Sequence, residues 1–310
     1  MFNVIPLINK RPEAFSNPRI FLTNRGGVMN NIKPYFLTTS LQKAKAAVLF
    51  QDILGKGLEY AVRAKELNKP IVVVQHGRSG VVDYLPPKNQ TMLSDKICVW
   101  GTRDYEMMLE AGFSKERIIL TGSPIFEGMI PKRVPHKGIN VLFAPAHPPQ
   151  ENKELQANLE IMEMLRSING VNIIPKILSV HVRSNYGRNA IVSNAFDNDH
   201  LTKCVKAVEI ADVLVSNQMG TIELIAMYFD IPVIFIDNRA VGRNRPAHQK
   251  NLGSYYINDV NDLPYALDLN LKQPGLMSKQ RKEELLAAAG VGLPGSPTLK
   301  IVETIKGLVK

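Results

Sequence analysis

Two turns in this sequence place chemically useful side chains directly after short apolar strands. Residues 211–237 read ADVLVSNQMGTIELIAMYFDIPVIFID, which predicts a strand, a polar turn, a helix opening at Thr221 and a second strand after Pro232. Such a turn aims backbone N–H groups and the positive end of a helix at its ligand, usually a phosphate. We therefore expect the phosphates of a nucleotide-activated donor to bind here.

The candidate donor-binding residues of this turn are Ser216, Gly220, Thr221 and Glu223. Backbone N–H groups near Gly220 and the hydroxyl of Thr221, the expected helix cap, suit a diphosphate. Glu223 lies one turn into the helix, where an acidic side chain can also simply complement the helix dipole. The turn as a whole favours nucleotide binding over that alternative.

The second turn contains His76, which follows the apolar run IVVVQ and precedes Gly77. An imidazole at the carboxyl end of a strand has the pKa range needed to take a proton from an attacking hydroxyl. The alternative is a histidine that only hydrogen-bonds the loop backbone. Asp83 is a second candidate base. Arg78 either contacts an anionic acceptor or is simply solvated.

Cationic side chains follow two further strands. Lys176, His181 and Arg183 come after the strand VNIIP and predict a cationic wall that would neutralise a leaving nucleotide; a solvated loop is the alternative. Arg243 and Arg245 lie in the loop after the strand VIFID, at the same edge as the phosphate turn. They predict an anion contact, with a basic loop that binds nothing as the alternative.

These residues must be positioned by alternating strands and helices, a pattern typical of parallel sheets covered by helices. A linker is predicted at residues 131–138, PKRVPHKG. The predicted domains are 1–132 and 133–275, with helices in 276–310 packing back toward the first domain. Strands are expected at 19–23, 47–50, 70–75, 96–100, 118–120, 140–143, 171–174, 213–215 and 233–236. Helices are expected at 54–67, 102–111, 151–167, 200–210, 221–229, 278–289 and 298–309.

Composition narrows the class of protein. The 310 residues carry a formal net charge of +10, which favours an anionic partner such as a nucleotide, a phosphorylated polymer, an anionic lipid or nucleic acid; a basic surface without a partner is the alternative. No apolar run reaches membrane-helix length, and no signal peptide is predicted. Cys98 and Cys204 are expected to be reduced and buried. A cytoplasmic protein is predicted, with attachment to a membrane surface left open.

Several well-known site patterns do not occur in the sequence. There is no zinc-ligand or EF-hand spacing, no Walker-type lysine loop and no G-x-S-x-G elbow. The run of Asp197, Asn198, Asp199 and His200 is more simply the start of a helix than a metal site. We therefore expect no metal and no cofactor apart from the donor itself.

Three stretches together resemble the GT-B superfamily: QHG at 75–77, WGTRDYEMMLEAGFSKERIILTGSP at 100–124, and the phosphate turn at 211–237. The similarity runs from about Ala47 to the end of the sequence. It is greatest to the branch containing CDP-glycerol glycerophosphotransferases and hydrolysing UDP-N-acetylglucosamine 2-epimerases. The resemblance implies an α/β fold of two Rossmann-like domains facing a cleft.

The resemblance also implies roles for single residues. His76 would act as the base, Glu223 would bind ribose hydroxyls, and His147, in the loop APAHP at 144–148, would face the donor phosphates; a structural proline turn is the alternative there. The chain departs from the branch where Arg78 follows His-Gly and where Lys176 stands apart from His181. The fold therefore transfers better than the donor and acceptor do.

Three functions remain open. The first is transfer of a sugar or polyol-phosphate from a nucleotide-sugar or CDP-polyol donor to a hydroxyl of a glycan, an anionic polymer or DNA. The second is a hydrolysing nucleotide-sugar 2-epimerase, which needs acid/base carboxylates near the sugar. The third is a basic protein that binds DNA or another polyanion, with or without sugar transfer. Candidate carboxylates for the second are Asp52, Asp83, Asp95 and Asp104.

Overall fold

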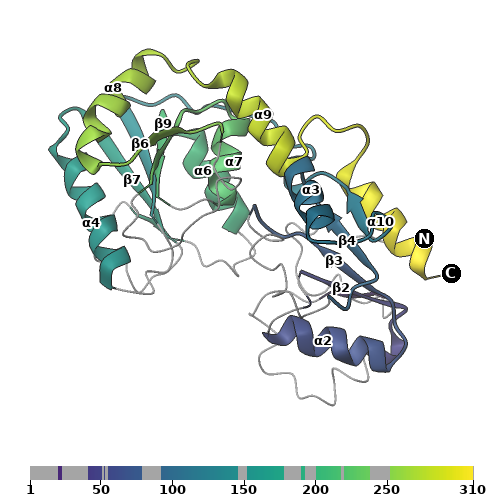
Figure 1. Ribbon diagram of the computed structural model, residues 1–310. Coiled ribbons are helices and arrows are strands. Elements are labelled where there is room, and N and C mark those ends of the chain that lie inside the picture. Colours follow the sequence, from purple (N-terminus) through teal and green to yellow (C-terminus); the bar gives the residue numbers. More distant parts are fainter. Residues whose placement is uncertain are drawn as a thin grey trace. The chain divides into compact units, whose positions relative to one another are not determined.

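The computed structural model describes residues 20–22, 41–50, 52, 55–78, 92–145, 152–177, 190–192, 200–217, 220–237 and 252–309. The chain forms two compact units (Figure 1). The first comprises Met1–Met129 together with Leu286–Lys310, and the second comprises Ile130–Leu285. The end of the chain is thus part of the first unit.

The first unit is built on a parallel sheet with strand order β1-β2-β3-β4-β5. Adjacent strands pair in parallel along the whole sheet, for example Ala47 with Ile71 and Val73 with Ile97. Its strands are β1 (Ile20–Leu22), β2 (Ala46–Leu49), β3 (Ile71–Val74), β4 (Lys96–Val99) and β5 (Ile118–Leu120). Its helical elements are α2 (Gly55–Glu66), α3 (Thr102–Glu110), the 3-10 turn η4 (Pro124–Phe126) and α10 (Pro297–Leu308).

Both faces of the first sheet are covered, as expected for parallel strands that are apolar throughout. Alternate residues of β2 and β3 point to opposite faces, and all of them are buried. One face packs against Tyr60 and Ala61 of α2 and Met108 of α3. The other packs against Ile301 and Ile305 of α10. The C-terminal helix therefore completes the core of the N-terminal sheet.

The second unit has a six-stranded parallel sheet with order β11-β10-β9-β6-β7-β8. The chain starts at β6, adds β7 and β8 on one side, and then adds β9, β10 and β11 on the other. The strand order therefore reverses at β6, and open α/β sheets bind ligands at the carboxyl ends of strands beside such a reversal. The strands are β6 (Ile139–Ala144), β7 (Val171–Ile177), β8 (Ile191–Val192), β9 (Val213–Ser216), β10 (Val233–Ile236) and β11 (Tyr255–Ile257).

The helices of the second unit lie on both faces of its sheet. Figure 1 shows α4 and α8 on one side and α6 and α7 on the other. The core on the first side joins Ile161 and Leu165 of α4 and Leu267 of α8 to inward-facing residues of β6, β9 and β10. The helical elements are α4 (Asn152–Ser167), α6 (His200–Glu209), α7 (Thr221–Tyr228), the 3-10 turn η8 (Val260–Asp262) and α8 (Leu263–Lys272). Helix α9 (Ser278–Ala289) begins in the second unit and ends in the first.

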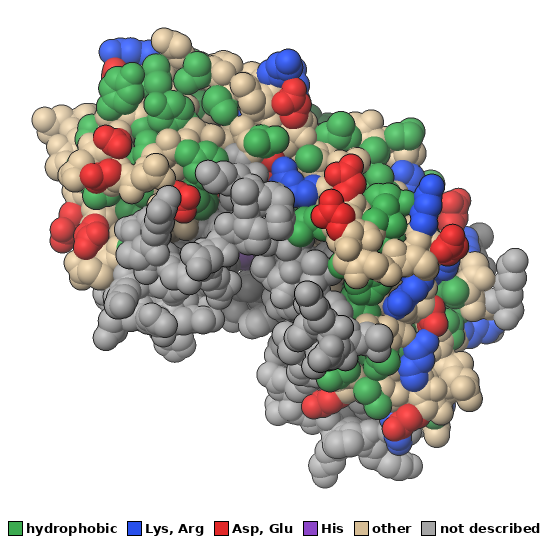
Figure 2. All heavy atoms as spheres, viewed as in Figure 1, with side chains coloured by type: hydrophobic (Ala, Val, Ile, Leu, Met, Phe, Trp, Pro, Cys, Tyr) green, Lys and Arg blue, Asp and Glu red, His purple; other side chains and the backbone are tan. Residues whose placement is uncertain are grey.

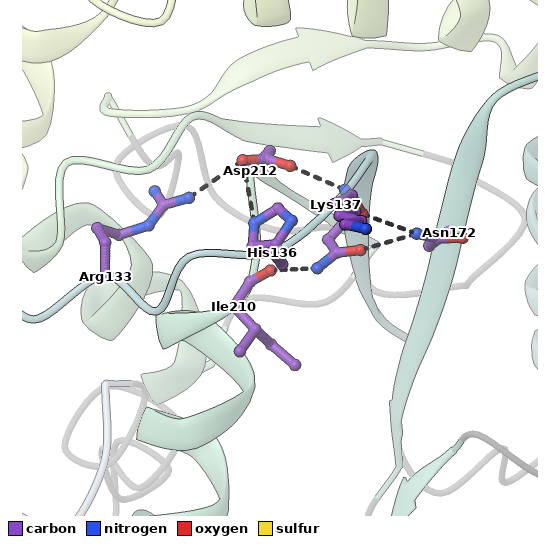
Figure 3. Close-up of polar contacts among 7 residues, drawn as sticks. Arg133, His136, Lys137, Asn172, Ile210 and Asp212 are labelled. Atoms are coloured by element: carbon purple, nitrogen blue, oxygen red, sulfur yellow. Dashed lines mark hydrogen bonds and ion pairs between the residues drawn. The ribbon is translucent and has the colours of Figure 1, made fainter.

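The segment that enters the second unit, residues 130–138, is held at the amino edge of its sheet (Figure 3). The Asp212 carboxylate, just before β9, accepts hydrogen bonds from the Arg133 guanidinium at 3.1 Å and from the Asn140 backbone N–H at 2.8 Å. Its Oδ1 also lies 3.5 Å from Nε2 of His136. This edge is opposite to the carboxyl edge, so Arg133 and His136 anchor the linker and are not part of a carboxyl-edge site.

Most predicted elements are confirmed to within a few residues, including the strand at 118–120, the strand at 233–236 and the two C-terminal helices. Four features differ. The strand predicted at 171–174 continues to Ile177, and β8, β11 and α8 were not predicted. The two missed strands are only two and three residues long, too short to show a period of two.

Candidate functional site

His76 lies directly beyond the carboxyl end of β3, half-buried, as its position after IVVVQ predicts. Its ring packs against that of Phe50, with centroids 5.6 Å apart and planes tilted by 54°. Phe50 follows β2, which pairs with β3 in parallel, so the two rings meet at the same edge of the sheet. Such an edge is where open α/β sheets place their ligands.

Gln75 holds the turn that contains His76, a role that sequence reasoning missed. Its Oε1 accepts the backbone N–H of Trp100 at 2.7 Å, and its Nε2 donates to the Gly77 carbonyl at 2.9 Å and to Oδ2 of Asp104 at 2.6 Å. Gln75 is 2% exposed and Asp104 is 3% exposed. The one signal in the sequence was a glutamine at the end of the otherwise apolar run IVVVQ.

Arg78 is 7% exposed, so the interpretation of it as a solvated side chain is wrong. A long cationic side chain is rarely buried unless its charge is compensated. Its predicted contact with an anionic acceptor stays a prediction. Asp52 and Asp95, which were candidate epimerase carboxylates, bind backbone N–H groups of their own unit, at Ser94 (2.6 Å) and Ile71 (2.7 Å) respectively.

The second turn joins β9 to α7, as predicted, but its cap differs. The N-cap is Gly220, with extended backbone, and Thr221 is the first residue inside the helix. The expectation that Thr221 caps the helix is therefore wrong. Instead, Oε2 of Glu223 accepts the Gly220 N–H at 2.8 Å, and Glu223 is fully buried. An acidic side chain at the third helical position can reach back in this way and replace a side-chain cap.

This contact bears on the expected anion site. An α-helix leaves its first four N–H groups without partners in the helix, and here Glu223 takes the one at Gly220. The contact corresponds to the alternative in which Glu223 complements its own helix start. A ribose contact by Glu223, and phosphate contacts by Ser216, Gly220 and Thr221, stay predictions. Ser216 is fully buried at the end of β9.

Asn158 supports the same turn from α4 and was not predicted. Its Oδ1 accepts a hydrogen bond from Nδ2 of Asn217 at 2.7 Å, and both side chains are buried. Asn217 directly follows β9. The signal lies in the helix pattern: Asn158 occupies the same stripe as the buried Ile161, Met162 and Leu165 of α4, spaced by three and four residues.

Lys176 does not lie in a loop, and the prediction that it follows a strand is wrong. It is a residue of β7, pairs with Ile191 of β8 and is 4% exposed. The strand passes through Pro175, which faces Phe143 of β6, so proline did not end it. Burial raises the pKa of the Cys204 thiol on α6, and the charge of Lys176 opposes that rise. Both cysteines are free and buried, as predicted.

Six predicted site residues lie outside the described residues: Asp83, His147, His181, Arg183, Arg243 and Arg245. Within the described ranges, no three His, Cys, Asp or Glu side chains form a group that could hold a metal ion. In the same ranges, no helix is both long enough and apolar enough to cross a bilayer.

The motifs W-G at 100–101 and T-G-S-P at 121–124 serve backbone packing in the first unit. A Cβ at Gly101 would lie 1.9 Å from the carbonyl oxygen of Ala287 near the end of α9. The Ser123 N–H donates to the Ala289 carbonyl at 2.8 Å, and Ser123 also caps η4. Gly290 has φ +65°, and a Cβ there would lie 2.2 Å from the Trp100 carbonyl oxygen. These small residues let the end of α9 contact the carboxyl ends of β4 and β5.

Two Rossmann-like units, each with a parallel sheet and polar turns at its carboxyl edge, define the GT-B fold, and comparison with solved structures places the chain in that fold class. The sequence matches no family profile and no curated protein. The expected α/β, two-domain GT-B-like fold is therefore confirmed by the structural comparison. Sequence identities of 13–14% show the fold and nothing finer.

Three similar structures illustrate the match. The wall teichoic acid polymerase TagF, soaked with CDPG, superposes with a TM-score of 0.58 at 13% identity, covering 95% of this chain and 83% of TagF. The complex of S. aureus MnaA with UDP gives a TM-score of 0.58 at 14% identity, covering 92% of this chain and 81% of MnaA. The UDP-GlcNAc 2-epimerase from Neisseria meningitidis, bound to UDP-GlcNAc, gives 0.57 at 13% identity, covering 90% and 84%.

Proposed function

We propose that this chain is a transferase that moves a sugar or a polyol-phosphate from a nucleotide-activated donor to a hydroxyl acceptor, with His76 as general base. His76 takes the acceptor's proton as the acceptor oxygen bonds to the transferred group. The bond from that group to the nucleotide's phosphate oxygen breaks, and the nucleotide leaves with the electron pair. The turn from Ser216 to Thr221 holds the donor's phosphates.

The observation that carries this proposal is the placement of His76. It is a half-buried imidazole beyond the carboxyl end of a buried parallel strand, packed on Phe50 and flanked by a turn that Gln75 holds. A general base needs a defined position as well as a suitable pKa. The fold adds support, because matched structures of this fold were solved with UDP, UDP-GlcNAc and CDPG.

The donor is the first thing to identify. A thermal-shift screen of the full chain against UDP, CDP, GDP, dTDP and CMP should show one ligand that raises the unfolding temperature above the others. A ligand that binds only the native state stabilises it by about 2.7 kcal/mol when present at roughly 100 times its Kd. No response to any of the five would contradict a nucleotide-dependent function.

Replacement of His76 then tests the mechanism. In His76→Ala, transfer to acceptor should fall by about 10²–10⁴-fold, the usual contribution of a general base. The thermal shift with the selected nucleotide should persist, because the proposed donor turn lies in the other unit. His136→Ala is a matched control, since His136 belongs to the linker contacts with Asp212. Unchanged transfer in His76→Ala would remove His76 from the mechanism.

The second candidate is a hydrolysing nucleotide-sugar 2-epimerase, and the structural match to a UDP-GlcNAc 2-epimerase favours it. That chemistry needs a carboxylate near the reacting sugar, and Asp104 is too deeply buried to supply it, at 3% exposed. Product analysis separates the two functions, because an epimerase releases a free epimerised sugar without any acceptor.

The acceptor is suggested only by charge. Lys and Arg side chains are interspersed with Asp and Glu over the surface seen in Figure 2, so the described surface in that view shows no broad basic patch. In the sequence, residues 178–189 and 238–251 contain arginines and a lysine but no acidic residue. We propose an anionic acceptor such as a phosphorylated polymer or DNA. Binding to duplex DNA that weakens steeply with salt would support DNA, and salt-independent binding would count against it.

A further inference from the structure

The hydrogen bonds of Gln75 give that residue a more specific role than packing. Its amide uses one acceptor and two donors, and the three partners lie in different places: the residue after β4, the first turn of α3 and the turn after β3 itself. Trp100 offers an N–H, while Gly77 offers a carbonyl and Asp104 a carboxylate. The amide can therefore be oriented in only one way.

This arrangement restrains the chain on both sides of His76. Gln75 precedes His76 and is anchored to β4 and α3, and Gly77 follows it and is anchored to the Gln75 side chain. The backbone that carries the imidazole is thus tied at both ends, and the Phe50 ring limits where the imidazole itself can turn. Other side chains of similar length cannot replace the amide, because a carboxylate lacks the donors and an aliphatic chain lacks both donor and acceptor.

We propose that Gln75 is the positioning residue for His76, with Asp104 and Trp100 as its anchors. The inference rests on the proposed role of His76 as the base. Gln75 does not touch the reacting groups in this scheme; it keeps the imidazole where it can take the acceptor's proton. A displacement of about 1 Å in such a group can reduce the rate by about 10²-fold.

Gln75→Glu is the sharpest variant, because it changes chemistry with almost no change in shape. The Trp100 N–H keeps an acceptor, but the two donated hydrogen bonds become contacts between a carboxylate and the acceptor oxygens of Gly77 and Asp104. Asp104→Asn is the matched control, since its side-chain carbonyl can still accept from Nε2 of Gln75. If Gln75→Glu fails to fold, Asp104→Ala serves instead, because it removes one anchor and leaves Gln75 unchanged.

The primary measurement is the imidazole of His76, followed by NMR in histidine-labelled full-length protein and assigned with His76→Ala. In Gln75→Glu, the His76 resonances should move, while in Asp104→Asn they should stay close to wild type. With the selected donor, kcat should fall by about 10²-fold and the KM for the donor should change little. Trp100, the single tryptophan of the sequence, reports whether the fold around the turn persists.

The outcomes separate this inference from the proposed function. If folded Gln75→Glu shows wild-type His76 resonances and wild-type kcat, Gln75 has no positioning role. If its melting temperature falls but the His76 resonances and kcat are unchanged, the amide only stabilises the fold, and the inference is equally overturned. If His76→Ala retains transfer, the proposed function fails, whereas the NMR result still decides whether Gln75 positions the imidazole.

Discussion

Replacing Gly101 by alanine should destabilise the protein far more than the same change at Gly220. Both glycines are helix N-caps with extended backbone, at φ −116° and −151° respectively, so the loss of cap preference is similar in both, about 0.5–1 kcal/mol. They differ in what an added Cβ would meet. At Gly101 it would lie 1.9 Å from the Ala287 carbonyl oxygen, and at Gly220 it would meet nothing within 4 Å.

The size of the effect follows from the overlap. Ordinary contact begins near 3.4 Å, so the Cβ and the oxygen would have to separate by about 1.5 Å. The nearest atoms are backbone atoms of Ala287 and Ala288, so no change of rotamer relieves the clash. Overpacking typically costs about 1–3 kcal/mol, and a backbone clash belongs at the upper end. A loss of about 3 kcal/mol lowers Tm by roughly 6–12 °C in a unit of this size.

Two measurements test this expectation. Trp100 directly precedes Gly101 and is fully buried, so its emission during urea or thermal unfolding reports on the first unit. Gly220 lies in the second unit, so Gly220→Ala is measured by calorimetry, which records the unfolding of both units. Similar shifts for the two variants, or a loss below about 1 kcal/mol at Gly101, would refute the close approach of α9 to the end of β4.

Three further predictions follow from single contacts. Burial raises the pKa of Glu127, but hydrogen bonds from hydroxyls and an N–H at the start of α10 outweigh burial and lower the pKa below 4.5, the ordinary carboxyl value. Glu127→Gln should therefore be less stable than wild type above pH 4.5 and equally stable in acid, as measured by Tm against pH. Arg281 is buried and pairs with the exposed Asp230 at 2.7 Å. Arg281→Met should lower the free energy of unfolding in urea by about 1–3 kcal/mol, which is less than the loss expected when both side chains of an ion pair are buried. Asn158→Ala removes the oxygen that accepts the hydrogen bond from Asn217 at 2.7 Å. The Kd for the nucleotide, measured by calorimetric titration, should rise about tenfold, and the His76 resonances should not move.

The elements that could be predicted are those whose own residues decide whether they form a strand or a helix. Strands such as β3 and β10 are unbroken runs of apolar residues, because they are covered on both faces of a parallel sheet. The short strands β8 and β11 lie at the two edges of the second sheet, and their pairing with β7 and β10 decides their structure. That pairing is a property of the folded chain and leaves almost no pattern in two or three residues.

The errors at the site have the same origin. Lys176 was predicted to follow the strand VNIIP, and proline is rare inside a central strand, yet β7 continues past Pro175 to pair with β8. A threonine before a helix usually caps it, yet the capping group at α7 comes from Glu223, three residues inside the helix. In both cases a long-range or reciprocal contact overrides the local preference, and a single sequence does not contain that contact.

Several motifs behind the resemblance to GT-B proteins have structural roles in the first unit, which explains why the resemblance predicted the fold. The W-G and T-G-S-P motifs contribute glycines and a serine that let the end of α9 contact β4 and β5. They therefore determine how the C-terminal helices join the first sheet, independently of any reaction. The proposed chemistry would depend on different residues, the imidazole of His76 and the turn before α7, which are supported by the buried amides of Gln75 and Asn158. Amides of this kind carry no motif of their own, so the features that would identify the reaction are the least visible in the sequence.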